Sequence, residues 1–112
     1  MFALATDERS LLVFASSFDA TDHCEGVDVE DGGWMFWDEH GDALAPQFVS
    51  PNRRGKFVVE NGNFILAPAP DKPGLSLTVA RIHHLEPNPF FADLEAVLRY
   101  LGSNSPRATD GT

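Results

Sequence analysis

The clearest pattern of apolar positions lies near the C-terminus and is typical of an amphipathic helix. Apolar residues recur there every three or four positions, with charged residues between them: Phe90, Phe91, Leu94, Val97, Leu98 and Leu101. Asn88 suits the helix start, Pro89 its first position and Gly102 its end. The pattern predicts a helix over residues 89–101, followed by a flexible tail over residues 103–112.

Apolar positions alternate with turn residues in the middle of the chain, which predicts strands. Asn61-Gly62 favours a tight turn, so residues 56–67 are predicted to form a hairpin. A polar turn at residues 39–42 predicts a second hairpin over residues 34–49, in which Pro46 indicates an edge strand or a bulge. The alternation over residues 75–83 predicts one more half-buried strand.

The N-terminal pattern is ambiguous between strand and helix. Residues 2–5 and 11–15 are predicted to pair as a hairpin, although Thr6 is also suited to cap a helix reaching Phe18. A short helix is expected near residues 17–25, capped by Ser16 or Ser17 and closed by Gly26.

This order of elements predicts an α+β fold in a single domain over residues 1–102. We expect a mostly antiparallel sheet of about five to seven short strands with the helices packed on one of its faces. A chain of 112 residues that is 43% hydrophobic has enough apolar material for a core without a metal or a disulfide.

Charge is distributed unevenly along the chain. Residues 1–50 contain eleven acidic residues and one basic residue, whereas residues 51–112 contain six acidic and seven basic ones, so −10 and +1 give the net −9. This asymmetry attracts a basic protein and repels nucleic acid and anionic membranes. It predicts a protein partner of basic character, with no nucleic acid and no membrane.

The aromatic segment at residues 34–37 adds an apolar element to this acidic half. Its alternation leaves both strand faces apolar, which predicts either a central strand covered on both sides or an exposed aromatic face that binds a partner. Aromatic anchors beside charged residues are typical of protein interfaces. The predicted partner-binding residues are Asp28, Glu30, Asp31, Trp34, Trp37, Asp38, Glu39 and Asp42.

A basic cluster follows the acidic half, at Arg53, Arg54 and Lys56. Guanidinium groups bind carboxylates and phosphates in a bidentate manner. We predict an anion or dimer contact here, in which the cluster neutralises the chain's own acidic half within one subunit or across a dimer. The protein is accordingly expected to be a monomer or a weak homodimer.

Residues suited to catalysis or metal binding are few. His83 and His84 are weak candidates for acid–base chemistry with a carboxylate from residues 38–42, and His40 is a third weak candidate. The acidic loops lack EF-hand spacing, and no His or Cys pair has zinc-site spacing, so neither a metal nor a cofactor is predicted. Cys24 is the one cysteine, which favours a reducing compartment and a buried, inert thiol.

The combined pattern favours a small acidic cytoplasmic protein of bacterial type that docks its acidic N-terminal half on a basic partner, as an inhibitor or immunity-like protein does. Two alternatives remain open. One is a small metal-assisted or histidine-dependent hydrolase, and the other is a homodimeric structural module. An enzyme is the less favoured interpretation, because the sequence contains no catalytic motif.

Overall fold

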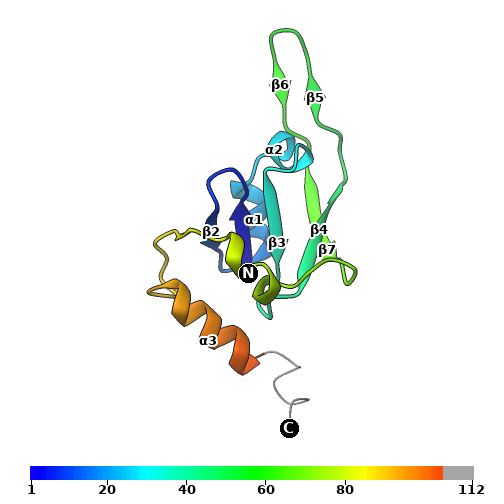
Figure 1. Ribbon diagram of the computed structural model, residues 1–112. Coiled ribbons are helices and arrows are strands. Elements are labelled where there is room, and N and C mark those ends of the chain that lie inside the picture. Colours follow the sequence, from blue (N-terminus) through cyan, green and yellow to red (C-terminus); the bar gives the residue numbers. More distant parts are fainter. Residues whose placement is uncertain (105–112) are drawn as a thin grey trace.

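The computed structural model describes residues 1–104, and a six-stranded sheet forms their centre (Figure 1). The strand order is β7-β4-β3-β1-β2-β8, and neighbours are antiparallel except for the parallel pair β2–β8. The strands are β1 (Phe2–Ala5), β2 (Ser10–Val13), β3 (Trp34–Trp37), β4 (Ala43–Phe48), β7 (Phe64–Pro68) and β8 (His84–Leu85). The predicted α+β class with a mostly antiparallel sheet is confirmed.

Two predicted hairpins are present. β1 pairs with β2 in the N-terminal hairpin, which settles the ambiguity there in favour of strands. β3 pairs with β4, as expected for residues 34–49. The Asp38 carboxylate holds the β3–β4 turn by accepting hydrogen bonds from the amides of His40 (2.9 Å) and Asp42 (3.0 Å). Gly41 completes the turn with a φ of 82°, a conformation that disfavours residues with a Cβ.

The predicted hairpin over residues 56–67 is wrong. β6 (Val59–Glu60) pairs instead with β5 (Arg53–Arg54), and β7 pairs with β4. Neither Asn61 nor Gly62 is among the described residues with positive φ. Tertiary contacts explain the difference, since the Asn61 side chain accepts a hydrogen bond from the Val27 amide (3.0 Å) and the Gly62 amide donates to Asn52 (2.7 Å). Asn61-Gly62 therefore joins the β5–β6 hairpin to its surroundings.

The short helix is confirmed as α1 (Ser17–His23), and Ser16 caps it by accepting a hydrogen bond from the Asp19 amide (3.2 Å). Gly26 does not close this helix. It begins a second short helix, α2 (Gly26–Glu30), that the sequence pattern did not predict.

Residues 75–83 do not form the predicted strand. They form two 3₁₀ helices, η1 (Leu75–Leu77) and η2 (Val79–Arg81). Thr78 stabilises the turn between them by donating its hydroxyl to the Gly74 carbonyl (2.8 Å). Leu75 and Ile82 are buried while Leu77 is 69% exposed, so the alternation in sequence does not correspond to alternating burial.

The C-terminal helix, α3 (Leu94–Asn104), begins later than predicted. Asn88 uses its side chain to form a turn by accepting from the amides of Phe90 and Phe91, and Asp93 caps the helix by accepting from the Ala96 amide (2.8 Å). Gly102 lies inside the helix. Of the predicted tail, residues 103 and 104 belong to α3 and residues 105–112 lie outside the described part of the chain.

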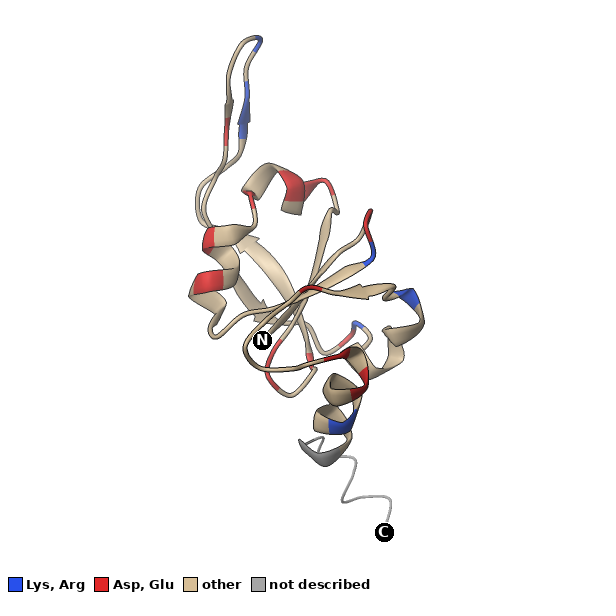
Figure 2. Cartoon of the chain, turned by 90° about the vertical axis from the view of Figure 1, so that its left-hand side faces the viewer, with Lys and Arg blue, Asp and Glu red and all other residues tan. Residues whose placement is uncertain are grey.

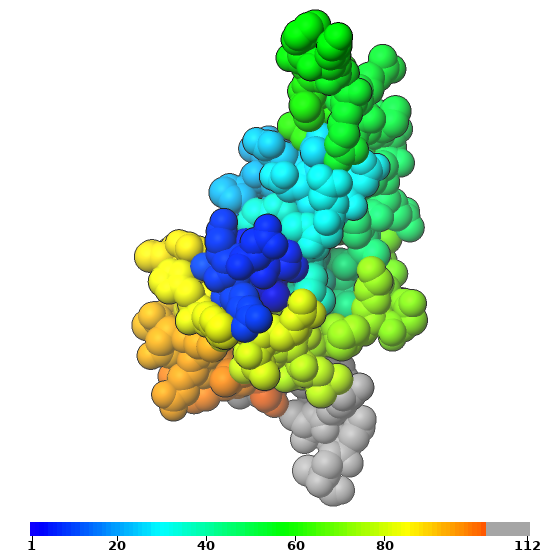
Figure 3. Space-filling view, turned by 45° about the horizontal axis from the view of Figure 1, so that its top comes forward, coloured from blue at the N-terminus to red at the C-terminus, as the bar shows by residue number. Residues whose placement is uncertain are grey.

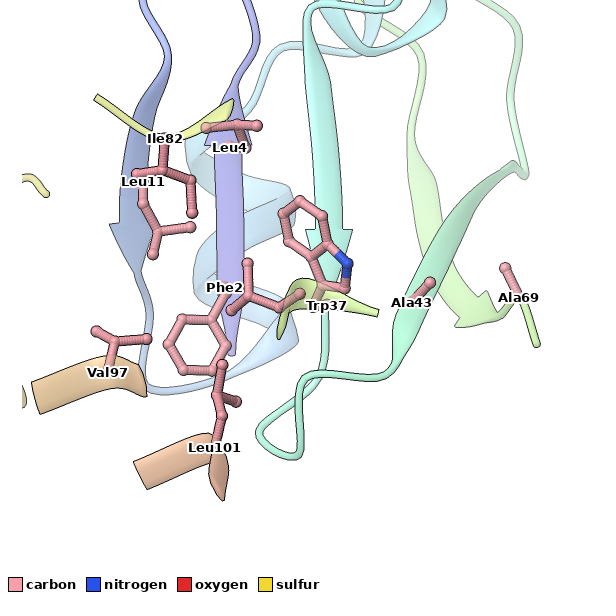
Figure 4. Close-up of a cluster of buried hydrophobic side chains, with 10 residues drawn as sticks. Phe2, Leu4, Leu11, Trp37, Ala43, Ala69, Ile82, Val97 and Leu101 are labelled. Carbon is pink, nitrogen blue, oxygen red and sulfur yellow. The ribbon is translucent and has the colours of Figure 1, made fainter. Parts of the chain in front are cut away.

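Helical segments cover both faces of the sheet, not one face as predicted. On one face η1, Ile82 after η2, and α3 bury the cluster shown in Figure 4, in which Leu75, Ile82, Val97 and Leu101 pack against strand residues. On the other face α1 and α2 cover a second cluster: Ala3, Cys24, Val29, Phe36 and Phe64. The prediction that β3 is a central strand covered on both sides is confirmed.

Pro46 lies in β4, which is an interior strand and not the edge strand or bulge that the sequence indicated. Two backbone hydrogen bonds flank the β4–β7 pairing, from the Val49 amide to Asn63 O and from the Ala69 amide to Ala43 O. With the observed register they make Pro46 and Leu66 a non-hydrogen-bonded pair. Its nitrogen therefore faces β3, whose pairing with β4 has already ended at Leu44. The missing N–H interrupts no ladder bond.

Candidate functional site

The candidate site is an acidic pocket of about 370 Å³ at one end of the central strands. Asp7 and Glu8 from the β1–β2 turn lie on one side, and Asp28 and Asp31 from α2 and its following residue lie on the other. Trp34, the first residue of β3, contributes to the wall. Figure 3 shows the blue N-terminal hairpin against the cyan α2–β3 segment, where these two sides meet.

Backbone pairing positions the two sides of the pocket. Ala5 and Trp34 are opposite each other in the β1–β3 ladder, so the β1–β2 turn and the α2–β3 loop leave the sheet at the same end. Thr6 then joins the two, because its amide donates to Gly33 O (3.0 Å) and its hydroxyl to Gly32 O (3.0 Å). Gly32 has a φ of 82°, which allows the tight reversal between α2 and β3.

Arg54 supplies a positive charge beside this pocket. Its guanidinium donates to Glu30 at 2.7 Å and to Asp31 at 2.9 Å, which ties the β5–β6 hairpin to α2. The hydrogen bond from Arg54 lowers the pKa of the Glu30 carboxyl, and the same bond raises the pKa of the guanidinium. Figure 2 shows blue positions on the projecting hairpin above the red positions of the helical segment. Arg54 is thus paired with acidic residues of its own subunit.

The two predicted aromatic anchors have different environments. Trp34 is half-buried, with its ring near those of His23 and Phe36. Trp37 is 1% exposed and donates its indole N–H to the Pro73 carbonyl (3.1 Å). Burial removes Trp37 from the predicted partner surface and leaves Trp34 as the tryptophan that reaches a pocket.

The predicted acidic surface is divided between opposite ends of the sheet. Asp28 and Asp31 lie beside Trp34, at the start of β3, with Glu30 nearby, and Arg54 engages both Glu30 and Asp31. The turn residues Asp38, Glu39 and Asp42 follow Trp37, at the other end of the same strand. The sequence did not reveal this separation, because the strand places its two flanking loops far apart.

His83 and His84 do not meet the acidic turn with which they were predicted to act. Ser10 pairs with both Ala5 and His84, and Ala5 pairs with Trp34, so His84 lies at the Trp34 end of the sheet while His40 lies in the opposite turn. The proposed pairing of His83 or His84 with residues 38–42 is therefore wrong.

The three histidines have other polar neighbours. His83 Nε2 lies 3.1 Å from Arg9 Nη1, and His40 Nε2 lies 3.6 Å from a Glu39 carboxylate oxygen. His84 Nε2 lies 3.7 Å from Glu86, whose carboxylate also accepts from the Ser10 hydroxyl (3.2 Å). The carboxylate stands between serine and histidine, so this group lacks the nucleophile–base contact of a catalytic triad.

Residues 1–104 offer little basis for metal binding or for catalysis by a thiol. No group of three His, Cys, Asp or Glu residues is arranged there to hold a metal ion. Cys24 is 3% exposed, and burial raises the pKa of its thiol to about 12. The predicted buried thiol is confirmed, and a protonated thiol is a poor nucleophile. No helix in that part of the chain is long and apolar enough to cross a membrane.

A larger pocket of about 540 Å³ lies at the opposite end of the sheet, near Asp38, His40 and Lys72. The Asp38 carboxylate is engaged by its own turn amides, and Lys72 brings a charge of opposite sign. The pocket beside Trp34 is lined by four carboxylates and no basic residue, and one of the four, Asp31, is paired with Arg54. Its lining is therefore the more acidic of the two.

Sequence reasoning missed Asp7 and Glu8 as site residues. The predicted N-terminal hairpin placed them in a turn, but their proximity to Asp28 and Asp31 depends on β1 pairing with β3. That pairing joins residues about thirty positions apart, and no local pattern specifies it.

Comparisons of the chain with protein-family models, with curated proteins and with solved structures give no match.

Proposed function

We propose that the protein is a binding module whose acidic pocket, the one lined by Trp34, binds a basic protein partner. In this proposal a lysine or arginine side chain of the partner enters between Asp7 and Glu8 on one side and Asp28 and Asp31 on the other. The observation that carries the proposal is the convergence of four carboxylates and one indole on a single pocket from two separate turns.

Physical chemistry supports a cationic side chain as the ligand. Carboxylates accept charge-assisted hydrogen bonds from guanidinium and ammonium groups, and an indole attracts a cation placed over its ring. The acidic residues of the N-terminal half add long-range attraction, which raises association rates and orients docking. The contact between Arg54 and Asp31 (2.9 Å) is a precedent within the molecule for guanidinium recognition at this place.

The partner class we favour is a basic toxin or nuclease, for which this protein acts as an inhibitor or immunity-like protein in the cytoplasm. A carboxylate-lined pocket suits such a role, because it occupies the basic residues with which a nuclease holds phosphates. The lone buried Cys24 is compatible with a reducing compartment.

The first test uses a penta-arginine peptide and the double variant Asp7→Asn/Asp28→Asn. An exposed ion pair contributes about 0.2–1 kcal/mol, so removing two carboxylates should weaken binding by about 2- to 30-fold. Calorimetry gives the affinities, and Trp34→Phe should remove the fluorescence change that the peptide causes.

The matched control is Glu39→Gln/Asp42→Asn, which removes the same charge at the opposite end of the sheet. At about 0.15 M salt the Debye length is about 8 Å, so this variant should bind the peptide nearly as the parent does. Equal losses in both double variants would contradict the proposal, since only net charge would then matter. A basic protein captured from lysate by the parent, and lost with Asp7→Asn/Asp28→Asn alone, extends the result to the partner.

A further inference from the structure

The sheet has an outer edge at β7. β7 (Phe64–Pro68) is the terminal strand of the six, and within residues 1–104 only β4 pairs with it. In Figure 1 the ribbons of β7 and β4 overlap on the side of the sheet away from β2.

The hydrogen bonds at the ends of the β4–β7 ladder show which backbone groups face outward. The Val49 amide donates to Asn63 O (2.9 Å) and the Ala69 amide to Ala43 O (2.9 Å). With the observed register, these bonds make Gln47↔Ile65 and Ala45↔Ala67 the hydrogen-bonded pairs. The N–H and C=O groups of Phe64 and Leu66 therefore point away from β4, toward the open edge.

This edge lacks the charges that usually protect an exposed strand. Residues 61–70 contain no charged side chain, and Ile65 at the centre of β7 is 52% exposed. Natural sheets protect their edges with lysines and other charges, with prolines or with very short strands. Pro68 and Pro70 limit the edge to its first residues, which leaves Phe64, Ile65 and Leu66 available for pairing.

We propose that two copies of the chain pair through β7, antiparallel about a two-fold axis at Ile65. In this register Phe64 of each copy pairs with Leu66 of the other, and the outward N–H and C=O groups form four backbone hydrogen bonds. The two Ile65 side chains meet across the axis as a non-hydrogen-bonded pair, the arrangement in which side chains are closest. The contact is self-complementary, as a two-fold interface requires.

Charge complementarity favours a second copy of the chain as the partner of the β7 edge. The β5–β6 hairpin leaves β4 at its Phe48 end and carries three basic residues and one acidic residue over residues 53–60. The acidic turn with Asp38, Glu39 and Asp42 lies at the Ala43 end of the same strand. Antiparallel pairing reverses one copy, so the basic hairpin of each copy lies at the same end of the joint sheet as the acidic turn of the other, with the two β4 strands about 14 Å apart.

The lengths on both sides of the axis are compatible with this contact. Gln47 lies opposite Ile65 and therefore level with the axis, Asp42 is five residues before Gln47 and Arg53 is six residues after it. At about 3.4 Å per residue, Asp42 and Arg53 lie at most about 17 Å and about 20 Å from the level of the axis, measured along the strand direction, so the acidic turn and the basic hairpin reach similar levels on opposite sides of it. Arg53 and Lys56 form no ion pair within residues 1–104, whereas Arg54 is engaged by Glu30 and Asp31.

Sedimentation equilibrium of the full chain over a range of concentrations tests the proposal. We expect a concentration-dependent dimer, and Ile65→Lys should raise its dissociation constant at least about tenfold, because two lysines then meet at the axis. Leu77→Lys is the matched control, since Leu77 is 69% exposed and lies on η1, away from this edge. A monomer at millimolar concentration, or equal effects of the two lysines, would overturn the proposal.

Two further experiments test the dimer without a substitution in β7. One reverses charges at the proposed contact, and the other measures amide hydrogen exchange in the parent protein. Lys56→Glu should weaken the dimer, and adding Asp42→Lys should restore it across the two-fold axis. In the parent protein the exchange of the Phe64 and Leu66 amides should slow as concentration rises, while that of the Leu77 amide stays constant. Concentration-independent exchange at Phe64 and Leu66 would contradict the pairing, whatever the variants do.

Discussion

The burial and the neighbours of a strand residue in this chain depend on the face of the sheet on which its side chain lies. Trp34 and Trp37 are three positions apart in one strand, yet the first is half-buried beside a pocket and the second is 1% exposed. Opposite strand faces explain why their partners differ, since Trp34 packs with the α1 and α2 side and Trp37 with the η1 and α3 side. The Trp37 end of β3 is the more enclosed of the two.

Cys24 gives a test at the scale of one residue. Its thiol is buried, and its pKa is raised from 9.0 to about 12, which lowers the thiolate fraction about 1,000-fold at neutral pH. Iodoacetamide at pH 8 should therefore alkylate the folded protein at least about 100-fold more slowly than the protein in denaturant. Rapid labelling of the folded chain would show that Cys24 is accessible.

The same shift sets a pH dependence of stability. The folded chain keeps a proton on Cys24 that the unfolded chain loses between pH 9 and pH 12. This contribution to stability is therefore complete below pH 9 and is lost as the pH rises, and Cys24→Ala should flatten that part of the stability profile.

At the scale of elements, the β5–β6 hairpin has little apolar packing of its own. Phe57 is 90% exposed and Val58 and Val59 are each 59% exposed, so the hairpin buries little apolar surface. Polar contacts at its base replace that packing, through Arg54 with Glu30 and Asp31 and through Asn61 with Val27. The arm therefore depends on a few hydrogen bonds for its orientation.

Arg54→Ala tests this attachment. The hydrogen bond from Arg54 lowers the pKa of Glu30 below its ordinary value of 4.5, so the attachment is complete above that pH and is lost as the pH falls through the lowered value. In an NMR titration, the Glu30 carboxyl should titrate at higher pH in Arg54→Ala than in the parent. Arg53→Ala is the control, and it should leave the Glu30 titration unchanged.

At the scale of the whole molecule, the sheet separates two apolar clusters and joins distant parts of the chain. α3 follows a segment with little regular structure, yet it contributes Val97 and Leu101 to the same cluster as Phe2 and Trp37. Leu101 also lies over the β3–β4 turn, where a Cβ on Gly41 would come within 2.8 Å of its Cδ2. The C-terminal helix is thus part of the central core.

Leu101→Ala measures how much α3 contributes to the stability of the core. A buried leucine replaced by alanine loses about 2–5 kcal/mol of stability, because transfer and cavity terms add. Leu98→Ala is the control, since Leu98 is 38% exposed on the same helix and should cost less than about 1.5 kcal/mol. Urea unfolding followed by tryptophan fluorescence and by circular dichroism should give coincident curves in both variants. Separate transitions would show that α3 unfolds apart from the sheet.

The sequence by itself determined the features that depend on local patterns. Strand alternation and turn residues predicted the N-terminal hairpin and the β3–β4 hairpin, Ser16 indicated the start of α1, and the apolar stripe predicted α3. Apolar residues on both faces of β3 predicted its central place. Each follows from a periodicity or a capping preference that acts within about ten residues.

Tertiary structure alone decided the features that depend on contacts between distant segments. Asn61 and Gly62 bond to Val27 and Asn52 in place of forming a tight turn, and residues 75–83 coil into 3₁₀ helices against the core. The pairing of β1 with β3 brings Asp7 and Glu8 to Asp28 and Asp31, while the length of β3 separates them from Asp38 and Asp42. Strand order is set by the packing of the whole sheet, so local sequence did not specify which carboxylates share a pocket.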